Sequence, residues 1–318
     1  MDHPVMILTD SSAYLPSDLV ARYPIQVLPL MLTWDGQSYR DGVDIQTDEF
    51  YRRLSTSDTL PHTSQLSAEE IKSSVHSNLE KGYDVLVMPI SSGISNTYTT
   101  ALGAVQNFPK KRVAVLNTNL VCMALGFQVL AAARAAKSGA DLPTCVRIAG
   151  QAYGNIGEFG IIDNLKYLAA GGRINTAARL LSSAINLKPI LQFRDGKVEL
   201  AGSAITRRKA VARMLELAEK EMGNRTPMRI CVFHALAEDP ARELLAMAQE
   251  RFSPVESILA EFSPVVGAHV GPGTLAMAFH AGTEEALPPY PSSGQKTQHL
   301  GNQFQKTDIL EPAYARQL

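Results

Sequence analysis

Short apolar runs alternate with longer amphipathic stretches along the first half of the chain. Four of these runs are typical of strands covered on both faces, and they span residues 5–9, 25–32, 85–90 and 113–116. The stretches between them place apolar residues at helical spacing, as in 68–79 behind the capping box Ser67–Glu70. Strands that alternate with helices predict a mostly parallel, doubly wound sheet, which we assign to a first α/β domain of residues 1–155.

A second block of strands and helices follows. Its strand signals include a hairpin through Asp195-Gly196, and they cover residues 159–162, 189–193, 197–201, 229–233, 258–262 and 274–280. Helices are expected at 163–169, from Asn175 or Thr176 to 185, at 206–222 and at 239–252. This block predicts a second, mixed α/β domain of residues 156–286. Residues 287–318 begin with prolines and are then dominated by Ser, Gly and Gln, which predicts a disordered tail.

The stretch 85–100 combines a buried strand, a turn crowded with hydroxyl groups and the first turn of a helix. Open α/β sheets bind ligands at the carboxyl ends of their strands, and the free N–H groups of a helix start favour an anion. We therefore expect Ser95 to help hold the charged end of a small ligand. Helix capping is an equally good interpretation of this turn taken alone.

Three further clusters could meet Ser95 in a cleft between the two domains. Thr63 lies in a polar loop, 55–65, and its hydroxyl could donate to a ligand or stabilise the local turn. Arg173 follows a glycine turn beside a helix start, where it could bind a carboxylate or phosphate, or tie the domains together. His269 is expected in a tight, glycine-flanked loop, 267–273, and could donate to an anion or be structural.

Composition argues against several classes of protein. A net charge of −1 gives no electrostatic reason to expect nucleic acid or an anionic membrane surface as a partner. The three cysteines are odd in number and far apart, which argues against disulfides or a zinc site and for a reducing compartment. The first residues lack the layout of a signal peptide, and no apolar run approaches the roughly 20 residues of a membrane span. These observations predict a cytoplasmic protein without an integral membrane segment.

Cofactor signals are missing from the sequence as well. It carries no nucleotide-binding glycine motif and no metal-ligand spacing among its histidines, so neither a cofactor nor a metal is expected. An enzyme is the alternative to a binding protein, because Ser95, Asp163 and His269 follow the chain order of an α/β-hydrolase triad, which would act on acyl esters. However, the nucleophile elbow needs a small residue two positions after the serine, and Thr97 is β-branched.

Seven segments, in order, resemble the successive signatures of the DegV family of fatty-acid-binding proteins, which includes the carrier subunit of bacterial fatty-acid kinase. They are TDSS at 9–12, YRDG at 39–42, TSQLS at 63–67, SSGISNTY at 91–98, LKYLAAGGRI at 165–174, KPIL at 188–191 and HVGPG at 269–273. The resemblance covers about residues 4–282. Leu66 and Asn96 depart from the usual proline and glycine, and Asn96 puts the backbone angle beside Ser95 in question.

The resemblance implies a two-domain DegV-like fold that holds a long-chain fatty acid in an apolar tunnel between the domains. Carried over to this sequence, Thr63 and Ser95 contact the carboxylate. Arg173 and His269 lie where carrier subunits place groups around the acyl phosphate. The implied role is that of a bacterial lipid-binding carrier rather than an enzyme, with the bound fatty acid in place of a cofactor. A partner kinase would phosphorylate the bound carboxylate.

Overall fold

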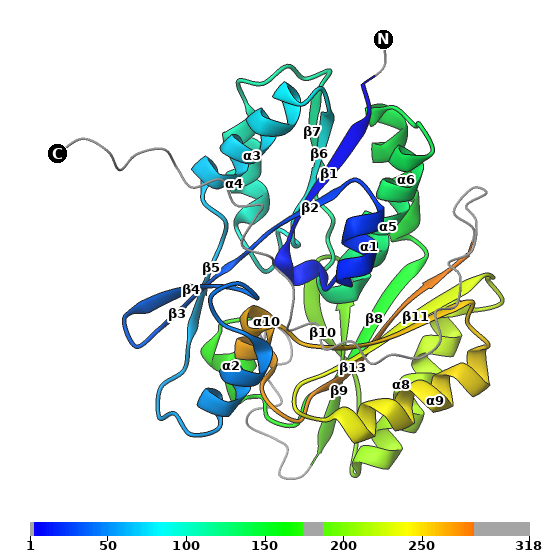
Figure 1. The fold of residues 1–318 in the computed structure, drawn as a ribbon. Helices are drawn as coiled ribbons and strands as arrows, with labels where there is room; N and C mark the ends of the chain where they lie inside the picture. The colour runs from blue at the N-terminus through cyan, green and yellow to red at the C-terminus, as the bar shows by residue number, and fades with distance from the viewer. Residues whose placement is uncertain (1–2, 174–186, 283–318) are drawn as a thin grey trace.

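The computed structural model describes residues 3–173 and 187–282. Two lobes, each built around its own β-sheet, lie one above the other in Figure 1. The helix expected up to residue 185 and the tail expected at 287–318 lie outside the described residues. Within the described part of the chain, none of the helices is both long and apolar enough to cross a membrane.

The first lobe contains a four-stranded sheet in which neighbouring strands are parallel. Its strands in spatial order are β2 (Ile25–Leu28), β1 (Val5–Asp10), β6 (Asp84–Met88) and β7 (Val113–Val115). Helix α1 (Ser17–Arg22) connects β1 to β2. Figure 1 shows two pairs of helices, one on each face of the sheet: α3 (Ala68–Glu80) with α4 (Thr97–Val105), and α5 (Cys122–Lys137) with α6 (Leu142–Tyr153). The predicted doubly wound parallel sheet is confirmed.

An excursion from the first lobe, residues 31–64, forms a small antiparallel sheet. Its elements are β4 (Gln37–Arg40), β3 (Met31–Trp34) and β5 (His62–Ser64), together with helix α2 (Thr47–Leu54). The single strand expected at 25–32 is therefore two strands, and the loop expected at 55–65 contains β5, which pairs Thr63 with Leu32. Sequence patterns miss β5 because it is a short, polar edge strand without apolar alternation.

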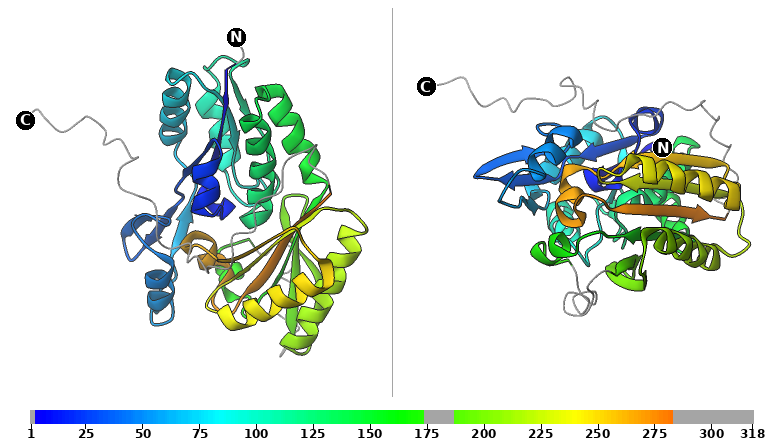
Figure 2. Two further views of the ribbon diagram at one scale, coloured as in Figure 1. Left: turned by 45° about the vertical axis from the view of Figure 1, so that its right-hand side comes forward. Right: turned by 90° about the horizontal axis from the view of Figure 1, so that it is seen from below.

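The second lobe contains a mixed six-stranded sheet. Its described strands in spatial order are β10 (Lys197–Ala204), β9 (Lys188–Arg194), β8 (Ile156–Ile161), β13 (Leu275–Ala281), β11 (Met228–His234) and β12 (Glu256–Glu261). Among them β11 and β12 pair in parallel, and the other neighbours pair antiparallel. Helices α8 (Arg207–Met222) and α9 (Glu238–Phe252) cover the outer face (Figure 2). This mixed α/β arrangement agrees with the predicted fold class.

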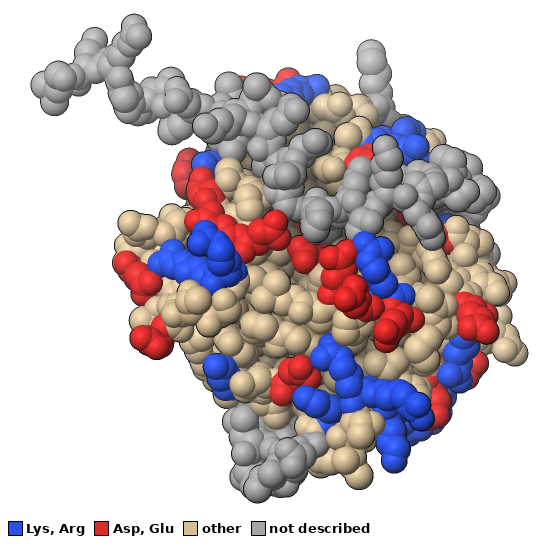
Figure 3. All heavy atoms as spheres, turned by 60° about the horizontal axis from the view of Figure 1, so that its bottom comes forward, with Lys and Arg blue, Asp and Glu red and all other residues tan. Residues whose placement is uncertain are grey.

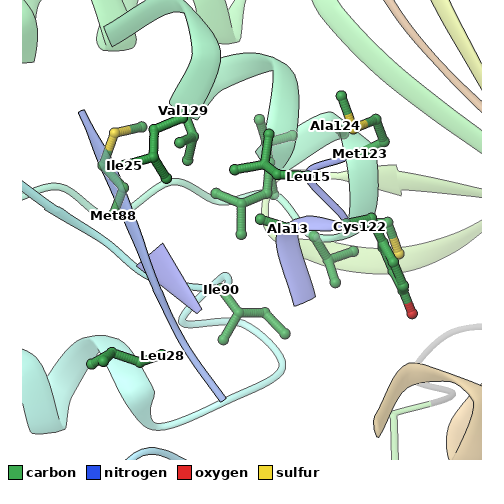
Figure 4. Close-up of a cluster of buried hydrophobic side chains, with 14 of the residues drawn as sticks. Ala13, Leu15, Ile25, Leu28, Met88, Ile90, Cys122, Met123, Ala124 and Val129 are labelled. Atoms are coloured by element: carbon green, nitrogen blue, oxygen red, sulfur yellow. The ribbon is translucent and has the colours of Figure 1, made fainter. Parts of the chain in front are cut away.

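Helix α5 lies between the two sheets. Every residue from Cys122 to Ala136 is buried, and many of them are alanines. One apolar core contains Met88 and Val129 of the first lobe together with Phe233 and Ala278 of the second. A helix that is apolar on nearly all sides belongs in an interior, and the two buried polar side chains of α5, Gln128 and Arg134, are hydrogen-bonded there. The two lobes therefore share one core, part of which is drawn in Figure 4.

The prediction of a tight loop at residues 267–273 is wrong, because most of this glycine-rich segment is helical. Helix α10 (Pro264–Val270) begins with Pro264 in its first turn and ends at Gly271, whose φ of 73° favours glycine. Gly267 lies inside the helix, where an added Cβ would come 2.6 Å from Oη of Tyr51 in α2. Gly267 thus permits close packing of α10 against α2.

Candidate functional site

A cavity of about 690 Å³ lies between the lobes. Ile90 and Val121 contribute to its wall from the first lobe. The second lobe contributes most of the apolar lining, which includes Ile162, Leu168, Leu191, Phe193, Val265 and Val266. Gly160 on β8 pairs with Ala276 on β13, and the small size of both residues leaves room for the cavity above the sheet.

The four side chains predicted to form a binding site all line this cavity: Thr63, Ser95, Arg173 and His269. Thr63 on β5 and His269 on α10 share a hydrogen bond of 2.7 Å between Oγ1 and Nε2. Nδ1 of His269 lies against Gly171, where an added Cβ would come within 2.1 Å of it. We call these four residues the polar corner, because they interrupt an otherwise mostly apolar wall.

Arg173 follows the short helix α7 (Lys166–Ala170), which begins later than the helix expected at 163–169. Its Nε donates to the carbonyl of Ile94 in the first lobe at 3.2 Å, and its Nη1 donates to the carbonyl of Gly171. Arg173 therefore ties the two lobes together, as one of the two interpretations of the sequence expected. Its side chain also lines the cavity, and its contact with Ile94 places it beside Ser95.

Ser95 stands just before the start of α4. Its Oγ accepts a hydrogen bond from the N–H of Thr97 at 3.2 Å and shares another with Oγ1 of Thr97 at 2.9 Å. A hydroxyl has one donor and two acceptor positions, so Ser95 can cap the helix and still donate to a ligand. Asn96 has a φ of −82°, an angle that any residue adopts. The departure from glycine at this position therefore leaves the geometry of Ser95 undisturbed.

The imidazole of His269 is held in its neutral form. Burial, with a smaller contribution from the nearby charge of Arg173, lowers the pKa of His269 to about 4. Its Nδ1 is buried and has no hydrogen-bond partner among the residues that the structure describes. A neutral imidazole carries a single N–H. When Nε2 donates it to Oγ1 of Thr63, the hydroxyl proton of Thr63 is left free for a bound anion.

Two buried carboxyl groups hold the segments around the polar corner. Asp10, at the end of β1, accepts a hydrogen bond from the N–H of Ile90 at 2.7 Å. Asp41 accepts from the hydroxyl of Ser263 at 2.8 Å and from the N–H of Val265 at 3.2 Å, in the first turn of α10. Asp41 thus links the first lobe to the helix that carries His269. These contacts give a structural role to the aspartates of the TDSS and YRDG segments.

The contacts of a hydrolase triad are not formed. His269 pairs with Thr63, and the oxygens of Asp163 accept from Lys188 at 2.9 Å and Arg207 at 3.2 Å. Ser95 is engaged with Thr97 rather than with a histidine. A triad requires the serine, histidine and carboxylate to be joined by hydrogen bonds, so this arrangement does not support the hydrolase hypothesis. In the described part of the chain, no group of three or more His, Cys, Asp or Glu side chains could hold a metal ion.

Sequence reasoning missed several polar residues of the cavity wall, and the acidic one among them is Glu158. Glu158 lies on β8 and lines the cavity with its carboxyl group buried. The signal was present, because a glutamate within the apolar run of residues 156–162 is unusual for a strand covered on both faces. The alternation of β8 turns this glutamate to the cavity side of the sheet.

The fold and the site together define a class: a two-lobed α/β protein with a cavity between the lobes that is mostly apolar and has one polar corner. The chain belongs to the DegV family, because residues 4–282 match this family, which is described as one of uncharacterised proteins. The resemblance found in the seven sequence segments is thereby confirmed.

Known relatives align with this chain over nearly their whole length. The DegV protein of Bacillus subtilis (strain 168) is 30% identical over 278 residues, which are 86% of this chain and 98% of the relative. A DegV family protein from Thermus thermophilus, whose structure is described as one of fatty acid binding, has a TM-score of 0.83 and 29% identity, with 88% of this chain and 100% of the other covered. The structure of Bacillus subtilis DegV, described as a fatty acid binding protein, has a TM-score of 0.80 and 28% identity, with 88% and 99% covered.

Proposed function

We propose that the cavity binds a long-chain fatty acid whose carboxylate lies at the polar corner. The observation that carries this proposal is the convergence of Thr63, Ser95, Arg173 and His269 on one apolar cavity between the lobes. The fatty-acid binding described for the Thermus thermophilus and Bacillus subtilis relatives supports the same ligand class. The boundary between the two proposed domains, 1–155 and 156–286, would then fall between the two walls of the cavity.

The polar corner supplies what a carboxylate needs when it leaves water. A buried carboxylate is costly unless hydrogen bonds or an opposite charge compensate it. Thr63 and Ser95 offer hydroxyl donors, and Arg173 is the cation that lines the same cavity within the described residues. The neutral His269, by donating from Nε2 to Oγ1 of Thr63, leaves the hydroxyl proton of Thr63 free for the ligand without adding a second charge beside Arg173. The arrangement would favour an acid over an ester or an alcohol.

The apolar wall supplies affinity for the chain. Each buried methylene contributes about 0.8 kcal/mol, so a long acyl chain gains more from its tail than from its head group. The cavity volume of about 690 Å³ lies within the range of roughly 300–1,000 Å³ that is usual for sites of small molecules. Gly160 and Ala276 provide the space in which the chain would lie against the sheet.

We assign the protein a carrier role in the cytoplasm rather than a catalytic one. The bound carboxylate would be presented to a partner kinase, where its oxygen attacks the γ-phosphorus of ATP to give an acyl phosphate and ADP. The half-buried positions of Thr63 and Ser95 leave the carboxylate end nearer to the surface than the interior of the cavity. Acidic and basic side chains occur together on the face of the molecule seen in Figure 3.

Ligand identification tests the binding proposal directly. Protein purified from cells and denatured for mass spectrometry is expected to release a fatty acid, and delipidated protein is expected to take up palmitate. The double variant Thr63→Ala/Ser95→Ala should bind palmitate more weakly. Ser38→Ala, which removes an exposed hydroxyl from β4 of the same small sheet, is the matched control and should bind normally. Failure to find or bind any acyl ligand would refute the proposal.

The carrier role needs a separate experiment. Protein loaded with palmitate is incubated with ATP, either alone or with the kinase subunit of a bacterial fatty-acid kinase, and acyl phosphate is trapped with hydroxylamine. We expect hydroxamate only when the kinase subunit is present. Hydroxamate without the kinase subunit would mean that this chain is itself catalytic. None in either sample would remove the kinase partner from the proposal and leave the binding step intact.

A further inference from the structure

One acidic side chain interrupts the apolar wall of the cavity away from the polar corner. Alternate residues of a strand share one face, and Glu158, Gly160 and Ile162 all line the cavity from β8 and its end. The residues between them, Phe159 and Ile161, are buried members of the core under α8 and α9. The strand therefore turns Glu158 toward the cavity and away from the outer core.

The surroundings of Glu158 on the sheet are apolar. Ala278 on β13 is its direct partner, and Cys231 on β11 is the next residue in the same row. Phe193, on the strand that flanks β8 on its other side, also lines the cavity. A carboxyl group in such a row interrupts an otherwise apolar surface. The cost of burying it therefore has to be compensated by contacts from outside the sheet.

Part of that compensation comes from the start of α5. The N–H of Ala124 and the thiol of Cys122 lie beside the carboxyl group of Glu158 and favour its ionised form. Burial outweighs both neighbours and raises the pKa of Glu158 to about 8, so the group is mostly protonated at neutral pH. Its Oε2 is buried and finds no hydrogen-bond partner within residues 3–173 and 187–282. The described residues therefore leave this oxygen of the carboxyl group without a partner.

Glu158 lies some way along the cavity from the polar corner. Ile162 belongs to an apolar cluster against which Val270, the neighbour of His269, is packed. Ile162 and Glu158 are four positions apart, which corresponds to roughly 13 Å at about 3.3 Å per residue of strand. An acyl chain with its carboxylate at the polar corner would pass Glu158 with its middle or its tail.

We infer that Glu158 makes the cavity selective for acyl chains that carry a hydroxyl group part of the way along the chain, an inference that rests on the proposed fatty-acid binding. The hydroxyl would pair with the carboxyl group of Glu158, which lines the cavity and has an oxygen without a partner among the described residues. A plain hydrocarbon chain offers no such partner, and neither does a double bond. Glu158 is thus proposed as a specificity-determining residue of the acyl site.

A purely structural role for Glu158 predicts a different result. If the carboxyl group only holds the start of α5, then it will not distinguish one acyl chain from another. The two roles separate when chains of equal length, with and without a hydroxyl, are compared. The position of the hydroxyl adds a second criterion, because only a hydroxyl at the depth of Glu158 can reach it.

The experiment measures binding of stearate and of three hydroxystearates to the delipidated full-length protein by calorimetry. The hydroxyl lies beside the carboxylate in the first isomer, in the middle of the chain in the second and near the tail in the third. One of the two isomers with a distant hydroxyl is expected to bind about tenfold more tightly than stearate. The isomer with the hydroxyl beside the carboxylate is expected to show no such gain.

Variants locate the preference at Glu158. Glu158→Leu should bind stearate at least as tightly as the unaltered protein and should lose the preference for the hydroxylated chain. Glu158→Gln keeps a donor and an acceptor, so it should retain part of the preference. Glu243→Gln, at an exposed position on α9, is the control and should leave the preference unchanged.

The outcomes separate this inference from the proposed function. Equal affinity for stearate and all three isomers, or a preference that survives in Glu158→Leu, overturns the inference while fatty-acid binding stands. No binding of stearate or of any isomer overturns both. The series of isomers on the unaltered protein decides the question even where Glu158→Leu does not fold.

Discussion

Thr63 and His269 lie 206 positions apart in the chain, yet their side chains share a hydrogen bond of 2.7 Å at the wall of the cavity. Thr63 belongs to the excursion of the first lobe, and His269 belongs to α10 of the second. The bond can form only when β5 and α10 are docked together. The bond therefore fixes the orientation of the imidazole, and it is present only in the correctly assembled pair of lobes.

Loss of the Thr63 hydroxyl should weaken ligand binding. Thr63→Val keeps the shape of the side chain but leaves Nε2 of His269 without its partner, so the affinity for palmitate is expected to fall about fivefold to tenfold. Thr63→Ser retains the hydroxyl and should bind within about twofold of the unaltered protein. Calorimetric titration provides both values, and equal affinities for the two variants would contradict a role for the hydroxyl.

The lowered pKa of His269 predicts how stability changes with pH. Between pH 6.5 and about 4, His269 binds a proton in the unfolded chain but not in the folded protein. The contribution of His269 to stability is therefore present above pH 6.5 and is lost as the pH falls toward 4. The loss amounts to at most about 1.4 kcal/mol for each pH unit in this window. The free energy of unfolding, measured by denaturant titration, should show this loss relative to His269→Gln, which does not titrate.

An NMR titration of His269 checks the same point independently of unfolding. Its ring protons should shift with a midpoint near pH 4 rather than near 6.5. A midpoint near 6.5, or a difference from His269→Gln that does not vary with pH, would show that the imidazole is not buried as described.

Filling the floor of the cavity should block the acyl chain without unfolding the sheet. An added Cβ at Gly160 would meet the Cβ of Ala276 at 3.5 Å and a backbone oxygen at 3.6 Å, both ordinary contacts. Gly160→Leu therefore places its bulk in the cavity, and we expect the affinity for palmitate to fall more than tenfold while the far-UV circular dichroism stays the same. Gly202→Leu, on β10 and outside the cavity lining, is the control. Normal palmitate binding by Gly160→Leu would place the acyl chain elsewhere.

A methyl group at Gly93 should disturb the contact between the lobes. Its Cβ would lie 2.1 Å from the carbonyl oxygen of Gly196, the atom that accepts a hydrogen bond from Ser91 at 2.8 Å. Gly93→Ala is expected to destabilise the protein by about 1–3 kcal/mol because backbone must move away from backbone. Gly103→Ala, inside α4 and facing open space, should instead stabilise it by about 0.5–1 kcal/mol. Thermal unfolding of both variants tests this difference in stability. Equal melting temperatures for Gly93→Ala and Gly103→Ala would show that Gly93 is only a flexible link.

Much of the fold could be predicted from the sequence because its strongest signals are local. The apolar run at 85–90 and the capping box of Ser67 and Glu70 each produce the expected element, and the capping box is present with both of its hydrogen bonds. Alternating strands and helices predicted the parallel sheet for the same reason. The sequence does not predict helix α10, because a glycine such as Gly267 can indicate either a loop or a close contact between two helices. Only the position of Tyr51, far away in the chain, distinguishes the two.

The candidate site was less predictable than the fold. Residue patterns point to the segments of Thr63, Ser95, Arg173 and His269, but each residue also has an ordinary local explanation in a turn, a cap or a lobe contact. Family resemblance is what favours the ligand-binding interpretation. Two of those ordinary roles are in fact present, at Ser95 and Arg173, beside the shared position on the cavity. Glu158 was overlooked because a single acidic residue in a strand does not reveal which face it occupies or what α5 brings next to it.

The burial of α5 against both sheets has a consequence for how the molecule comes apart. A fragment ending at residue 155 would expose the alanine-lined flank of this helix to water, and a fragment beginning at 156 would lose the covering of the inner side of its sheet. Neither half is expected to be an autonomous folding unit. Heat or denaturant should therefore melt both halves in a single cooperative step, although the ribbon suggests two separate bodies.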